Sequence, residues 1–223
     1  GEVFYTFPRK TALGGKYGTK LSLNYSLIHG IDRKPLPGQN TISEPGTDGY
    51  QSDFFEVGDV KHYRDLSVQM DKKINSDLKF VAGYTWLDYN VEVVEEEIAA
   101  GNRFYEMHTG LLDITYKLST KKAIRMELQY LSMEQDSGNW AMALAEYSIS
   151  PNWFFTVQDQ YNFNNPKSDN TYHYYTFGVA YAKSATRVSV SYGRQREGII
   201  CVGGVCRQVP ASSGLNLTIT SSF

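Results

Sequence analysis

Hydrophobic and polar residues alternate along most of this chain with a period of two. In the clearest segment, Ile124, Met126, Leu128 and Tyr130 alternate with Arg125, Glu127 and Gln129. The same alternation recurs in residues 20–27, 65–71, 78–86, 112–118 and 187–192. Because successive side chains of a β-strand point to opposite faces, this pattern predicts strands with one apolar and one polar face. It excludes a helical protein.

Weaker segments complete the pattern. Residues 3–7, 153–157 and 175–181 alternate less cleanly. Residues 140–149 also read as a strand, but Ala141, Ala143 and Ala145 leave open which side chains share a face. Together the segments predict roughly eleven strands.

The predicted connections alternate in length. Short turns are expected at residues 74–77, 119–122, 150–152 and 184–185, and longer loops at 30–59, 94–102, 164–170 and 198–213. The connection at 136–139 is short where a long one is expected. Short turns at one end and long loops at the other are typical of a transmembrane β-barrel with periplasmic turns and extracellular loops. A sandwich with Greek-key crossovers has no reason to alternate in this way.

The last predicted strand supports a membrane barrel. Leu215, Leu217, Ile219 and Phe223 share one face, and the chain ends at the aromatic residue. Such a strand is typical of the closing strand of outer-membrane barrels, so we expect these four residues to form an assembly signal. In a bilayer the apolar face would point to lipid and the polar face to the lumen.

We therefore expect an all-β fold, an antiparallel up-and-down transmembrane β-barrel, with residues 1–223 as a single domain and residues 30–59 as a long extracellular loop. Because bacterial barrels have an even number of strands, we expect the chain to be the C-terminal part of a longer barrel. The alternative is that residues 3–7 form a plug or clasp and the barrel has about ten strands.

Composition narrows the classes further. Hydrophobic residues make up 41% of the 223 residues, which excludes disorder, and 17 Tyr, 11 Phe and 3 Trp suit aromatic girdles. No apolar run of about 18 residues predicts a transmembrane helix. The formal net charge of −2 gives no sign of nucleic-acid binding.

The polar positions predict a lumen. The expected pore-lining residues are Lys20, Asn24, Gln69, Asp71, Lys79, Asp113, Lys117, Arg125, Glu127, Gln129, Arg187 and Ser189. Their mixed charges suit a wet pore that filters solutes by size. They equally suit lumenal salt bridges that stiffen the wall without any flux. The signs are nearly balanced, so strong ion selectivity is not expected.

The only two cysteines, Cys201 and Cys206, flank Val-Gly-Gly-Val. The glycine pair favours a tight turn, which would bring the two cysteines close enough for a disulfide at the tip of an extracellular hairpin. An exported protein would sit in an oxidising compartment that permits this bond. A metal site would need more ligands than this spacing supplies, and a redox-active pair is the remaining alternative.

Two stretches carry a family resemblance. Residues 193–214, which include the cysteine loop, resemble the C-terminal end of an uncharacterised, porin-like family of Bacteroidota outer-membrane proteins. Residues 1–18, with Phe7-Pro8-Arg9-Lys10 and Gly14-Gly15-Lys16-Tyr17-Gly18, are similar to an internal hairpin of that family. The resemblance implies an outer-membrane barrel whose N-terminal half is absent here, and it brings no catalytic residues.

Three functions follow as hypotheses. The first is a porin-like barrel of the bacterial outer membrane that passes small polar solutes passively. The second is a barrel that anchors a larger outer-membrane complex, and the third is a glycan-binding β-sandwich at the cell surface. No nucleophile-elbow motif is present, so neither catalysis nor a cofactor is expected. The expected partners are outer-membrane lipid, lipopolysaccharide, the barrel-assembly machinery and other outer-membrane proteins.

Overall fold

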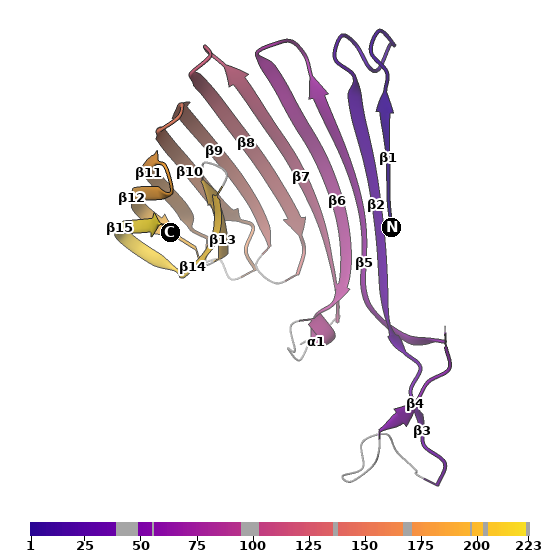
Figure 1. Ribbon diagram of the computed structural model, residues 1–223. Helices are drawn as coiled ribbons and strands as arrows, with labels where there is room; N and C mark the ends of the chain where they lie inside the picture. Colours follow the sequence, from indigo (N-terminus) through magenta and orange to yellow (C-terminus); the bar gives the residue numbers. More distant parts are fainter. Residues whose placement is uncertain are drawn as a thin grey trace.

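One curved antiparallel sheet makes up most of the protein (Figure 1). The computed structural model describes residues 1–38, 49–54, 56–94, 103–135, 138–166, 171–196, 198–202 and 205–221, with backbone alone for 198–202 and 205–209. Within these residues the sheet has eleven strands, and two further sheets have two strands each. The predicted all-β antiparallel meander is confirmed. It is one continuous sheet, not the two packed sheets of a sandwich.

The strands of the large sheet are long. They are β1 (Glu2–Phe7), β2 (Thr19–Ile31), β5 (Val57–Lys73), β6 (Leu78–Asn90), β7 (Phe104–Lys117), β8 (Lys122–Met133), β9 (Asn139–Ile149), β10 (Trp153–Phe163), β11 (His173–Lys183), β12 (Thr186–Gln195) and β15 (Ser212–Ser221). The small sheets pair β3 (Lys34–Pro35) with β4 (Tyr50–Gln51) and β13 (Gly198–Val202) with β14 (Val205–Val209). A single helical turn, α1 (Val91–Val94), follows β6.

The strands of the large sheet follow one another in chain order from β1 to β15. Each strand of the large sheet pairs antiparallel with the next. The small β3–β4 and β13–β14 sheets lie in the connections between β2 and β5 and between β12 and β15. The two edge strands lie on opposite sides of the curved sheet (Figure 1). Among the described residues no hydrogen bonds join β1 to β15, so these strands form an open, strongly curved sheet, and the predicted larger barrel is not closed within it.

The two ends of the sheet differ in their connections. The four predicted short turns are confirmed, because β6, β8, β10 and β12 each begin within five residues of the preceding strand's end. They lie along one rim, together with the β1–β2 connection (Figure 1). The opposite rim carries the β3–β4 pair, α1 and the β13–β14 pair. The predicted loop over residues 30–59 is shorter than expected, because β2 continues to Ile31 and β5 begins at Val57.

Strand pairing determines the face on which each side chain lies. Glu127 lies opposite both Asp113 and Leu144, so the even-numbered residues of β9 share a face with the charged residues of β7 and β8. The three alanines of β9 therefore lie on the apolar face. This register settles the phase that the sequence left open.

Few side chains are deeply buried. The buried hydrophobic residues of the described chain are Tyr89, Val91, Met133, Leu144 and Ala180. Tyr89, Met133, Leu144 and Ala180 lie on the charged face, and none of the five is a strand residue of the apolar face, so the described chain shows no second layer packed there. None of the described helices is long and apolar enough to cross a membrane.

Candidate functional site: the concave face

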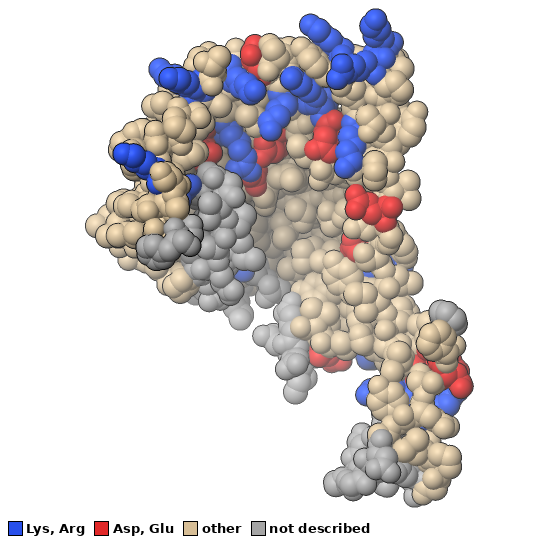
Figure 2. All heavy atoms as spheres, in the orientation of Figure 1, with Lys and Arg blue, Asp and Glu red and all other residues tan. Residues whose placement is uncertain are grey.

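The residues predicted to line a pore all lie on one face of the sheet. Register rows connect Lys20 to Asp71, and Asp113 to Glu127, and a neighbouring row connects Lys79 through Thr115 to Arg125. Figure 2 shows basic and acidic side chains gathered over the hollowed face, mainly toward the short-turn rim. We call this surface the concave face. The shared face is confirmed, whereas the pore itself stays a prediction.

Arg125 is the centre of the charged surface. Its Nε donates to Asp113 Oδ2 at 2.6 Å, and its guanidinium also pairs with Glu127. Glu127 in turn accepts a hydrogen bond from Gln129 Nε2 at 2.5 Å. The carboxylate side chains are only 19% and 14% exposed, so their charges are largely satisfied by the arginine rather than by water.

The other predicted residues are arranged around this cluster. Gln69 Nε2 donates to Asp71 Oδ2 at 3.0 Å, and Lys20 Nζ lies 4.8 Å from the centre of the Phe4 ring. Toward the β12 side, the Arg187 guanidinium lies 5.0 Å from the Phe154 ring. Lys79 and Lys117 lie near the short turns. Asn24 lies opposite Ser67 on the neighbouring strand, and Ser189 lies opposite Ala180. The structure thus brings Arg125, Asp113, Glu127 and Gln129 into contact and spreads the rest over the face.

Sequence reasoning missed several concave residues. Glu146 lies directly opposite Arg125, and Trp140 lies opposite Leu131, both on β9. Arg194 and Arg196 at the end of β12 were also missed. The alanine run hid the phase of β9, so the pattern contained no signal for Glu146 or Trp140.

The opposite, convex face is apolar and exposed. Leu21, Leu23, Tyr84, Met126, Leu128, Val157, Phe177, Val179, Leu215, Leu217 and Ile219 are among its exposed large side chains. Leu215, Leu217 and Ile219 therefore share the face expected for the assembly signal, while Phe223 lies outside the described residues. Ordinary soluble proteins seldom expose so continuous an apolar surface.

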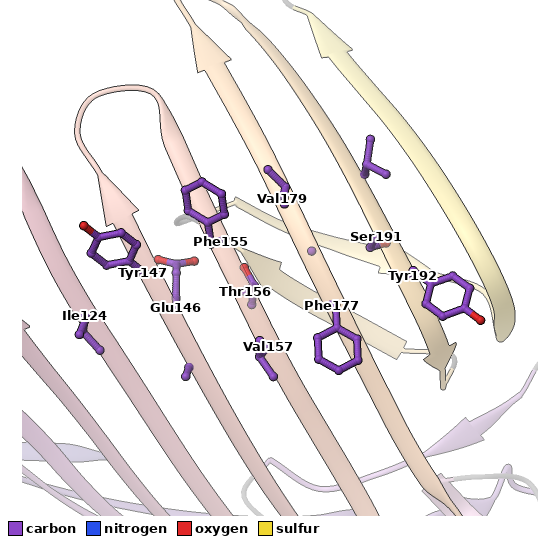
Figure 3. A pocket seen from close by; sticks show the side chains of 13 residues that line it. Ile124, Glu146, Tyr147, Phe155, Thr156, Val157, Phe177, Val179, Ser191 and Tyr192 are labelled. Carbon is purple, nitrogen blue, oxygen red and sulfur yellow. The ribbon is translucent and has the colours of Figure 1, made fainter.

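A shallow groove of about 540 Å³ runs along the convex face. Figure 3 shows its side chains, with Tyr147 from β9, Phe155 from β10, Phe177 from β11 and Tyr192 from β12 on neighbouring strands. Its exposed wall is almost wholly hydrocarbon and aromatic. Such a surface suits contact with an apolar phase rather than with a polar ligand.

The cysteines lie opposite one another. The β13–β14 register pairs Cys201 with Cys206, as the predicted hairpin requires. Their side chains lie outside the described part, so the disulfide stays a prediction. In the described ranges no group of three or more His, Cys, Asp or Glu side chains could hold a metal ion.

His108 and His173 lie toward the long-loop rim and make polar contacts with neighbouring side chains. His108 Nδ1 lies 2.7 Å from the Tyr84 hydroxyl, and His173 Nδ1 lies 2.8 Å from Asp159 Oδ2. Neither histidine contacts a serine, threonine or cysteine among the described residues, so the geometry offers no catalytic triad at these positions.

Comparison with known proteins places the chain in a sequence family. A family of unknown function (DUF6029) matches it over residues 1–223. No curated protein matches the chain. The expectation of an uncharacterised family is confirmed, while an outer-membrane location, a porin-like character and a bacterial group stay predictions.

Proposed function

Because the chain belongs to this family of unknown function, which brings no assigned activity, we propose a function from the geometry: the sheet is part of the wall of an outer-membrane β-barrel that passes small polar solutes. The observation that carries the proposal is the contrast between an exposed apolar convex face and a charged concave face. In a bilayer the convex face would contact lipid and the concave face would line water.

Strand length supports a membrane span. The strands from β5 to β11 have at least 11 residues each. A transmembrane strand needs about 9–11 residues at a tilt near 45°. The sheet is therefore tall enough to cross the hydrocarbon layer with little excess at either rim.

Aromatic residues of the convex face gather near both rims. Toward the short turns lie Tyr116, Tyr147, Trp153, Phe155 and Tyr181, and toward the long loops lie Trp86, Tyr130 and Tyr161. On β10, Trp153 and Tyr161 are about 26 Å apart along the strand at the usual rise per residue, which is roughly 20 Å of height at the tilt of a membrane barrel. Membrane barrels carry two such girdles on either side of an apolar band about 25 Å tall.

Closure of the wall is part of the proposal. The outer edges of β1 and β15 present unpaired backbone groups, which are costly in hydrocarbon. We therefore propose that further strands complete the sheet, as the expected larger, even-stranded barrel requires. The barrel-assembly machinery and lipopolysaccharide are the partners that such a barrel would meet.

Tryptophan fluorescence tests the two faces directly. Trp153 lies on the convex face and is 43% exposed, whereas Trp140 lies on the concave face. In vesicles containing brominated lipid, a variant that keeps only Trp153 should be strongly quenched. A matched variant that keeps only Trp140 should not be. Similar quenching of both would exclude the proposed orientation.

Passage of solutes needs its own measurement. Single-channel recording of the full-length protein in a planar bilayer should give discrete steps with weak ion preference, because the charges near Arg125 are paired. A folded barrel in the proposed orientation that never conducts would refute the porin function. The proposal that the sheet is part of a barrel wall would still stand.

The second candidate function is an anchoring barrel. The connection between β2 and β5 is ordered by ionic contacts in its described part, where Lys34 Nζ lies 2.8 Å from Glu56 Oε2 and 3.2 Å from Asp53 Oδ2. Arg33 lies 5.7 Å from the Tyr50 ring in the same region. An ordered projecting segment suits a docking surface for another outer-membrane protein. Co-purification that is lost when residues 33–53 are replaced by a short glycine-serine linker would support this function.

A further inference from the structure

The concave face contains a cavity that borders the Arg125 cluster at Gln129 and extends away from it. It has a volume of about 340 Å³ and lies toward the long-loop rim, between β6 and β10. Met107, Leu131, Met133 and Trp140 supply apolar walls, and Gln160 and Arg196 supply polar groups. A cavity of this size, with apolar walls and polar groups from Thr109, Gln129, Gln160 and Arg196, suits a small organic molecule that has both apolar and polar parts.

Arginine and aromatic side chains alternate beside this cavity. The Arg196 guanidinium carbon lies 4.5 Å from the Trp140 ring centre, and the Trp140 and Tyr174 rings lie 5.9 Å apart. Arg194 follows, at 5.1 Å from the Tyr174 ring and 4.2 Å from the Tyr172 ring. Cation–π contacts and one contact between aromatic rings link these groups. Such contacts position the two guanidinium groups without an acidic partner among the described residues.

Within the described residues the charge of these two arginines has no acidic partner. No described carboxylate lies within ion-pair distance of Arg194 or Arg196, whereas Arg64 pairs with one carboxylate and Arg125 with two. Asp159 belongs to the neighbouring strand but lies on the convex side, where it contacts His173. The cavity therefore has a positive edge and an apolar interior.

We infer that this cavity binds a small organic anion with a planar or apolar body. The Arg196 guanidinium would bind the anionic group through charge-assisted hydrogen bonds, and the body would lie against Trp140, Leu131 and Met107. Gln160 would complete the polar side. The inference goes beyond the proposed function, because binding here requires neither a closed barrel nor solute passage.

A structural role for Arg196 is the rival explanation. The cation–π contact with Trp140 by itself would tether the end of β12 to β9. A tether does not distinguish a charged ligand from a neutral one of the same shape. The test therefore compares phenylacetate with phenylacetamide, which differ in charge and hardly in size.

Calorimetric titration of the full chain in detergent measures both ligands. The wild-type protein should bind phenylacetate about tenfold or more tightly than phenylacetamide. Arg196→Gln should abolish that preference. Arg187→Gln is the matched control, because it removes a second arginine of the concave face that lies against Phe154 instead. Its preference should equal that of the wild type.

Trp140→Leu separates the two parts of the site. It should weaken the binding of both ligands. Phenylacetate should still bind more tightly than phenylacetamide, because Arg196 still supplies the charge. Circular dichroism and heat-modifiability of each variant confirm folding. Equal wild-type affinity for the two ligands, no binding of phenylacetate, or equal losses in Arg196→Gln and Arg187→Gln would overturn the inference. A silent bilayer recording beside selective phenylacetate binding would refute the porin function alone.

Discussion

The convex and concave faces are built by the same strands from alternate residues, yet they differ in almost every physical property. On β8, Met126 and Leu128 are 45% and 46% exposed on the convex side. Between them in sequence, Glu127 is held by Arg125 on the concave side. A protein that folds in water alone would shield such leucines and expose such charges. The contrast supports the proposal that the two faces meet two different solvents, lipid and water.

The largest expected effect comes from placing a charge on the convex face. Leu128→Arg should lower the free energy of unfolding by about 2–4 kcal/mol in lipid, the cost of an arginine near the bilayer midplane. Its neighbour variant Gln129→Arg should be tolerated, because the new side chain would lie on the polar face near Glu127. Urea unfolding in vesicles measures both. Equal destabilisation by Leu128→Arg and Gln129→Arg would show that the convex and concave faces are not in contact with different solvents.

The next effect tests backbone geometry instead of solvent. Gly193 has a φ of 150°, and a Cβ there would lie 2.0 Å from the Tyr175 carbonyl oxygen. Gly193→Ala should therefore cost about 1–3 kcal/mol of folding free energy. Gly110→Ala is the control, because a Cβ there meets nothing within 4 Å. A variant Gly193→Ala as stable as Gly110→Ala would contradict the close β11–β12 approach.

A smaller effect is expected from removing the paired cation of the concave face. Arg125→Met leaves Asp113 and Glu127 without their shared partner, at a cost of about 1–2 kcal/mol once their partial exposure is considered. Adding Asp113→Asn and Glu127→Gln should recover most of the loss, because no unpaired charge remains. If the triple variant is no more stable than Arg125→Met, the cluster does not stabilise the wall through charge pairing.

The smallest effect concerns the connection between β2 and β5. Hydrogen bonds to Glu56 and Asp53 raise the pKa of Lys34, and the bond from Lys34 lowers the pKa of Asp53. A lowered carboxyl pKa contributes stability above its unfolded value and loses it as the pH falls. Because water screens both groups, with side chains 43% and 78% exposed, Lys34→Gln should leave the unfolding midpoint unchanged at neutral and acidic pH. A measurable shift would show that this segment packs against the sheet.

The predicted disulfide of the β13–β14 hairpin can be tested directly. Cys201 and Cys206 are directly opposed in the β13–β14 backbone register. Thiol labelling of the denatured, unreduced protein should therefore find neither cysteine free. Full labelling without a reductant would exclude the bond. The control is the same sample after reduction, in which both should react.

Local pattern was enough for much of the fold. A period of two placed Arg125 and Glu127 on one face and Leu128 on the other, because neighbouring side chains on a strand always point in opposite directions. Short polar breaks at residues 74–77 and 150–152 were enough to mark turns, because a hairpin needs only its own residues. The apolar face of Leu215, Leu217 and Ile219 followed in the same way.

Only the tertiary structure decided what depends on pairing between distant segments. The phase of β9 required its register against β8, since three alanines fit either face equally well. The contact of Arg196 with Trp140 joins the end of β12 to β9, and no local rule relates residues so far apart in the chain. Curvature and the open edges of β1 and β15 are properties of the whole sheet. Alternation determines which side of a strand a residue occupies, whereas the neighbour it meets there depends on how all the strands pair.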